Sequence, residues 1–95
     1  MNKYELGVVF KPTLSEEMFN SEFDKLKELI EKTNSVIEKV DQWGKKRLAY
    51  EIQKFNEGFY NFIVFSANSN VPLELESKLR INENVLRYLI VRQEN

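Results

Sequence analysis

The stretch FYNFIVFSA at residues 59–67 decides the fold class of this chain. Its β-branched and aromatic residues are typical of a strand. A strand with one buried face alternates apolar and polar residues, but here both alternating sets are largely apolar. We therefore predict a strand whose odd-numbered face packs on a core. Its even-numbered face is either covered by something else or unusually aromatic.

Two further elements are expected after this strand. Asn70 is a candidate N-cap, and Pro72 suits the first turn of a helix that buries Leu75 and Leu79. We expect that helix to end near residues 80–82. Residues 85–92 then predict a last strand, which is again apolar on both faces.

A long extended segment precedes residues 59–67. Residues 36–52 are expected to form one strand, with the apolar residues at even positions on one face. The polar residues 44–46 interrupt this pattern and indicate a bulge or an exposed stretch. Residues 55–58, Phe-Asn-Glu-Gly, have turn chemistry, so we predict that a hairpin reverses there.

The first two elements have the clearest periodicity. Residues 4–10 alternate as a half-buried strand, and Pro12 ends it. A helix follows, capped either by Thr13, which has capping-box spacing with Glu16, or by Ser15. Its apolar stripe recurs at helical spacing and consists of Phe19, Phe23, Leu26 and Ile30.

The predicted order of elements is β-α-β-β-α-β over residues 1–95, which we expect to form a single domain. Two crossovers and one hairpin make a split βαβ arrangement, the ferredoxin-like fold. Its class is α+β. Right-handed crossovers place both helices on one face of a four-stranded antiparallel sheet, so the other sheet face is expected to be bare.

The composition excludes several classes of protein. The chain is 31% charged and has only three Gly and two Pro, which is typical of a globule. It has no His and no Cys, which removes catalytic triads, thiolate nucleophiles, disulfides and the usual zinc sites. No apolar run is long enough to span a membrane, and the first residues lack a signal-peptide pattern. We expect a cytoplasmic protein that is not an enzyme and has no cofactor or metal.

The charge is distributed unevenly along the chain, although the net charge is only −1. Residues 1–38 hold five basic and eight acidic side chains, whereas residues 39–95 hold nine basic and seven acidic ones. All four Arg follow residue 46, and Arg binds phosphate through its planar fork. The pattern indicates either ordinary surface solvation or phosphate binding by the second half of the chain.

Two surfaces of the expected fold are candidates for binding. The aromatic strand at residues 59–65 is similar to the base-stacking strand of RNA-recognition modules, but Glu57 and Asn61 depart from that motif. The alternative is that its second face packs as a minor apolar cluster. The basic run 45–47 lies between Trp43 and Tyr50. That combination suits RNA, a protein partner or a solvated hairpin.

Four motifs then resemble the family of the sixth protein of the bacterial small ribosomal subunit (bS6). They are Tyr-Glu at residues 4–5, WGKKRLAY at 43–50, EGFY at 57–60 and RINENVLR at 80–87. Each motif is weak alone. Together they are collinear and cover nearly the whole chain, which makes the resemblance specific.

The resemblance implies the same ferredoxin-like fold and a structural role in the small ribosomal subunit. It also implies binding to small-subunit (16S) ribosomal RNA in the central domain, as a heterodimer with the eighteenth small-subunit protein (bS18). A near-neutral chain makes few phosphate contacts, so sharing RNA affinity with a basic partner is physically sensible. We expect the free protein to be monomeric.

Site residues are assigned on this basis. The expected phosphate contacts are Lys3, Lys54, Arg87 and Arg92. The expected protein-partner surface consists of Trp43, Lys45, Lys46, Arg47, Leu48 and Tyr50. Arg47 is also a candidate for RNA contact, and Leu48 for core packing.

Two other functions use the same fold. A regulatory ligand-binding module would need a homodimer and a small polar pocket. A hydrolase of the acylphosphatase kind would need an anion-cradling loop after the first strand. Residues 10–14 there contain no Arg and no Gly, and we expect no phosphatase activity.

Overall fold

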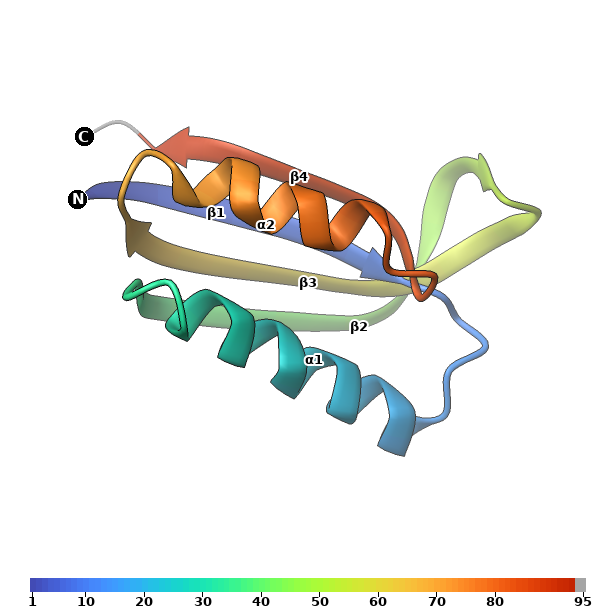
Figure 1. Ribbon diagram of the computed structural model, residues 1–95. Helices are drawn as coiled ribbons and strands as arrows, with labels where there is room; N and C mark the ends of the chain where they lie inside the picture. Colours follow the sequence, from blue (N-terminus) through green and yellow to red (C-terminus); the bar gives the residue numbers. More distant parts are fainter. Residues whose placement is uncertain (94–95) are drawn as a thin grey trace.

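The computed structural model describes residues 1–93 and has the element order expected from the sequence. Its strands are β1 (Asn2–Phe10), β2 (Val36–Ile52), β3 (Phe55–Ala67) and β4 (Val85–Gln93), and its helices are α1 (Glu16–Glu31) and α2 (Val71–Arg80). The four strands form one antiparallel sheet in the order β2-β3-β1-β4. Both helices lie on the same face of this sheet (Figure 1), so the predicted fold class is confirmed.

The main core lies between the sheet and the two helices. The even-numbered residues of β1 and the odd-numbered residues of β3 face the helices, as period-2 alternation requires. The α1 stripe packs onto them and consists of Phe19, Phe23, Leu26 and Ile30, all buried. Each large apolar side chain that becomes fully buried contributes about 1.5–3 kcal/mol. This layer therefore supplies most of the hydrophobic stabilisation.

The helix starts follow the local sequence. Ser15, rather than Thr13, caps α1, and its hydroxyl accepts a hydrogen bond from the backbone N–H of Met18 at 3.2 Å. Asn70 occupies the N-cap position of α2, but its side chain makes no capping hydrogen bond. Pro72 lies in the first turn of α2, as expected. Neither helix is long and apolar enough to cross a membrane.

The predicted position of the hairpin turn is wrong. The chain reverses at Gln53 and Lys54, where Ile52 pairs directly with Phe55. Both turn residues have positive φ, 50° and 71°, which is the type I′ geometry that Asn-Gly usually supplies. Gly58 belongs instead to β3.

Close packing, not a turn, explains why position 58 has a glycine. A Cβ there would lie 2.5 Å from Cγ1 of Val9 and 2.9 Å from the carbonyl oxygen of Phe10. Any larger residue would overlap the central strand β1. The turn-like composition of residues 55–58 thus reflects a tertiary contact.

The predicted single apolar face of β2 is also wrong. Register shifts occur between Ile37 and Lys39 and between Gln42 and Gly44, and each changes which residues share a face. Gly44 has φ 78°, so the interruption predicted there is a bulge with a left-handed glycine. Leu48 is the buried hydrophobic residue of this strand.

A second, smaller cluster lies on the sheet face away from the helices. Val9, Leu48 and Leu86 are buried there, and Phe55 and Tyr60 pack against them. This cluster holds the base of the β2–β3 hairpin against the end of β1. The remaining part of that face has no helix over it (Figure 1).

Candidate RNA and protein interface

The β2–β3 hairpin projects beyond the rest of the sheet, at the end opposite the N-terminus (Figure 1). Its strands have 17 and 13 residues, whereas β1 and β4 have nine each. Lys54, a predicted RNA contact, is exposed at the tip. The Lys54 ammonium group therefore lies beyond the ends of β1 and β4, where a bulky anion can reach it.

Arg87 and Tyr50 come together at the base of this hairpin. Nη1 of Arg87 donates a hydrogen bond to the Tyr50 hydroxyl at 3.2 Å. The guanidinium carbon lies 5.9 Å from the centre of the tyrosine ring, within cation–π range. A residue predicted for RNA and one predicted for the protein partner are therefore in direct contact.

The basic run 45–47 does not form a single patch. Successive strand residues point to opposite faces, and Lys45 lies over the ring of Phe59 with its Nζ 5.3 Å from the ring centre. Lys46 pairs with Gly58, and Arg47 with Glu57. All three basic side chains are exposed, but they are divided between the two sides of the hairpin.

The other two predicted partner residues differ in exposure. Leu48 is buried in the smaller cluster, so it supports the hairpin from below rather than forming its surface. Trp43 is 52% exposed and lies against Phe62 on the bare sheet face, with ring centres 4.8 Å apart. A large exposed indole is the kind of side chain that anchors a protein interface.

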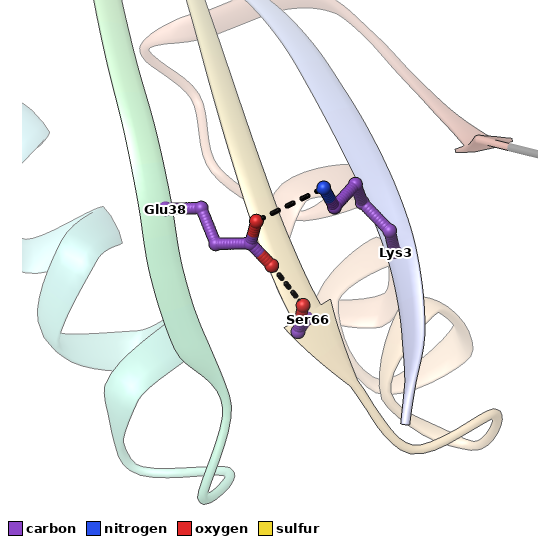
Figure 2. A network of polar contacts seen from close by, with 3 residues as sticks. All are labelled: Lys3, Glu38 and Ser66. Atoms are coloured by element: carbon purple, nitrogen blue, oxygen red, sulfur yellow. Dashed lines mark hydrogen bonds and ion pairs between the residues drawn. The ribbon is translucent and has the colours of Figure 1, made fainter. Parts of the chain in front are cut away.

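Lys3 and Arg92 lie at the opposite end of the sheet from Lys54 and Arg87. Figure 2 shows that the Glu38 carboxylate, from β2, contacts Ser66 on β3 and reaches across β3 to Lys3 on β1. The Glu38 Oε1 to Lys3 Nζ distance is 3.1 Å, and the Ser66 hydroxyl donates to Oε2. Arg92 donates from Nη2 to Oδ1 of Asn2 at 2.9 Å. The four predicted RNA contacts are therefore divided between two ends of the molecule.

The clip formed by Lys3, Glu38 and Ser66 has an electrostatic consequence. The Ser66 hydroxyl, and then the Lys3 ammonium, stabilise the carboxylate and lower the pKa of Glu38 below its ordinary value. Lys3 must leave this pair, or share it, to contact a phosphate. We expect it to contribute less to anion binding than the exposed Lys54.

The part of the chain that the structure describes shows no metal centre. No group of three His, Cys, Asp or Glu side chains within residues 1–93 is placed to hold an ion.

Comparison with known proteins identifies the family. The model of the family described as ribosomal protein S6 matches residues 3–92. The chain belongs to the ribosomal protein S6 family. It is 48% identical over 94 residues to small ribosomal subunit protein bS6 of Alkaliphilus oremlandii, with 99% of each chain covered. It is 46% identical over 94 residues to bS6 of Clostridium kluyveri, with the same coverage.

A solved structure from this family has the same fold. The chain matches the crystal structure of 30S ribosomal protein S6 from Thermotoga maritima with a TM-score of 0.93 and 32% identity. The match covers 97% of this chain and 87% of that one. The resemblance found in the sequence motifs is thus confirmed. As a member of the ribosomal protein S6 family, the protein is a structural, non-enzymatic component of the small ribosomal subunit.

Sequence reasoning missed part of the bare sheet face in this S6-family chain. It foresaw an aromatic face on β3, but not that Gly7 and Leu89 lie beside Phe62 in one row. It also did not foresee that Glu5 and Asp41 reach the same area. The only local signal is that residues 85–92 are apolar at both odd and even positions.

Proposed function

We propose that the protein binds small-subunit (16S) ribosomal RNA together with bS18, as a heterodimer formed during assembly of the central domain of the subunit. Family membership supports this role, because it places the protein in a ribonucleoprotein particle. The observation that carries the proposal is the charge of the projecting hairpin and its base. Five exposed cationic side chains lie along the two sides of the hairpin and at its base, against the carboxylates of Glu51 and Glu57: Lys45, Lys46, Arg47, Lys54 and Arg87.

The projecting hairpin suits the RNA backbone for two physical reasons. Its cations are exposed, so binding phosphate releases counterions without breaking a buried ion pair. Tyr50 holds Arg87 in place, which reduces the conformational freedom that the guanidinium loses on binding. Lys3 and Arg92 are secondary contacts in this proposal, because each already has an intramolecular partner.

The partner surface adjoins the RNA surface. We assign it to the hairpin and the neighbouring sheet face, with Trp43 and Tyr50 as the exposed aromatic residues and Leu48 as their support. The contact between Tyr50 and Arg87 makes the two surfaces continuous. A joint binding site for RNA and bS18 would gain affinity from both without a large charge on this chain. The free chain remains a monomer in this proposal.

A salt titration tests the RNA part. The affinity of the chain and bS18 for a central-domain 16S RNA fragment is measured by filter binding at several salt concentrations. Lys54→Gln is expected to weaken binding and to reduce the slope of log K against log salt by about one. The matched control is Lys25→Gln, which removes an exposed charge from α1. Equal slopes for Lys54→Gln and wild type would contradict the phosphate contact.

Two further measurements test the partner and the oligomeric state. Light scattering during gel filtration should give the mass of one chain alone and of a one-to-one complex with bS18. A homodimer without bS18, together with no bS18 complex, would contradict the proposal and favour a ligand-binding module.

A further inference from the structure

Glu38 lies in a β-bulge near the start of β2, far from the hairpin tip. Ile37 pairs with Phe65 on β3. The next pair is Lys39 with Val64, which leaves Glu38 as the extra residue between the two pairs. The bulge brings both Glu38 and Lys39 to the open face, which is the face of the sheet with no helix over it. A bulge re-aims a side chain, and this one directs the Glu38 carboxylate across β3.

Two donors on the neighbouring strands receive the Glu38 carboxylate. Lys3 and Ser66 are direct cross-strand partners on β1 and β3. Nζ of Lys3 lies 3.1 Å from Oε1 of Glu38, and the Ser66 hydroxyl donates to Oε2 (Figure 2). Lysine ammonium and serine hydroxyl groups are also the donors that proteins use to bind the phosphates of nucleic acids. Glu38 therefore occupies the position that a phosphate group would take on Lys3.

Two aromatic residues line the same groove as Lys3. The groove measures about 610 Å³, and Trp43 and Phe62 form part of its wall. Their ring centres are 4.8 Å apart, and Trp43 is 52% exposed. Bases of any sequence stack on exposed rings, while nearby cations hold the phosphates of the strand. With Lys3 free, the groove would have both parts of a site for single-stranded RNA.

The charges of the groove act against such binding. Its charged lining consists of three carboxylates and two ammonium groups: Glu5, Glu38, Asp41, Lys3 and Lys39. Removing the Glu38 carboxylate leaves two groups of each sign and releases Lys3. Arg87 on the same face pairs with Val9, about 20 Å along β1 from Lys3, and is held by Tyr50. Glu38 therefore sets the balance of charge beside the two rings.

We propose that Glu38 is a specificity-determining residue, which keeps single-stranded RNA off Trp43 and Phe62 by holding Lys3. Phosphate binding then stays with the exposed cations of the hairpin. This inference rests on the proposed RNA binding and adds to it a residue that limits where RNA binds. A protein gains specificity by weakening wrong contacts as well as by strengthening right ones.

Binding of a short uridine oligonucleotide to the free protein tests the proposal. Glu38→Gln keeps the length of the side chain and an acceptor for Ser66, but it removes the charge that holds Lys3. We expect Glu38→Gln to bind the oligonucleotide about two- to fivefold more tightly, as the release of one exposed ion-pair partner allows. The slope of log K against log salt should steepen by about 0.7, because one more phosphate is contacted.

Trp43 reports where the oligonucleotide binds, because it is the only tryptophan of the chain. Stacked bases should quench its fluorescence more in Glu38→Gln than in the wild type. Lys3→Gln alone should leave the affinity unchanged, and Lys3→Gln combined with Glu38→Gln should cancel the gain. The matched control is Glu17→Gln, which removes the same charge from α1 in the opposite layer and should give no gain. Urea unfolding of every variant confirms that the fold is intact.

The outcomes separate this inference from the proposed function. If the wild-type protein and bS18 fail to bind the central-domain fragment, the proposed function fails and this inference with it. If the fragment binds, but Glu38→Gln gains no affinity for the oligonucleotide or gains equally without Lys3, only this inference fails. A gain without quenching of Trp43 would place the RNA elsewhere and overturn the inference. An equal gain for the central-domain fragment would also overturn it, because Glu38 would then not affect specificity.

Discussion

Gly58→Ala should destabilise the protein, because no space exists for a methyl group at this position. The added Cβ would lie 2.5 Å from Cγ1 of Val9 and 2.9 Å from the carbonyl oxygen of Phe10. Carbon atoms in favourable contact are about 3.5–4.0 Å apart, so the neighbours must move by about 1 Å. Val9 can turn its side chain, but the Phe10 carbonyl belongs to the backbone at the end of β1, which pairs with both β3 and β4.

The expected size of the effect follows from two opposing contributions. Overpacking a well-filled site costs about 1–3 kcal/mol, and the rigid carbonyl places this site in the upper part of that range. Replacing glycine with alanine also lowers the conformational entropy of the unfolded chain, which stabilises the folded state by about 0.4–1 kcal/mol. The net loss is about 1–2.5 kcal/mol. For a domain of this size, each kcal/mol lowers Tm by about 4–8 °C.

Urea unfolding followed by circular dichroism and by Trp43 fluorescence measures this loss. Gly44 supplies the comparison, because it has φ 78° and open space where a Cβ would lie. Asn adopts the left-handed conformation more readily than other side-chain residues, so Gly44→Asn should lose stability only through backbone strain and with no overlap of atoms. Gly58→Asn should be worse than Gly58→Ala, since it adds more atoms to a filled site. An unchanged midpoint for Gly58→Ala would refute the packing argument.

Three further predictions concern stability and binding. Leu26→Ala should lose about 2–5 kcal/mol in urea unfolding, because Leu26 is buried in the main core; an unchanged midpoint would contradict that placement. Gln53→Gly should stabilise the hairpin by up to about 1 kcal/mol, because it removes a side chain from a left-handed backbone position, and it should keep RNA affinity. Lys54→Gly should stabilise the hairpin similarly but weaken RNA binding. A stabilised Lys54→Gly with full RNA affinity would exclude Lys54 from the RNA contact. Glu38 has a lowered pKa in the folded state, so its contribution to stability is present above its unfolded pKa and is lost as the pH falls through the folded pKa. Glu38→Gln should therefore flatten the acid side of the stability profile, and a profile identical to that of the wild type would argue against the clip with Lys3.

Local rules were sufficient for the order of elements. Pro12 ends β1 because proline cannot donate to a ladder, and Ser15 starts α1 because its hydroxyl satisfies a free N–H. The helical spacing of the α1 stripe determines which side of α1 is buried. Pro72 at the start of α2 is a local signal of the same kind. Each of these signals acts within a few residues, so the sequence alone predicts the fold class.

The hairpin shows where local rules were insufficient. Gln53 and Lys54 have no turn signature, yet they adopt positive φ because pairing between β2 and β3 extends to Ile52 and Phe55. Gly58 has turn-like neighbours but is required by the approach of β1. Strand pairing and packing therefore outweigh the backbone preferences of Gln53 and Lys54. A local sequence pattern cannot predict contacts between strands that are distant in sequence.

The candidate sites divide in the same way. The sequence by itself determined the family, the lack of catalytic His and Cys, and the clustering of Arg in the second half of the chain. Only the tertiary structure brought Arg87 to Tyr50, paired Lys3 with Glu38, and placed Leu89 beside Gly7. The physical reason is register. A strand pairs with a distant segment at one alignment that the whole core selects, and that alignment decides which side chains share a surface.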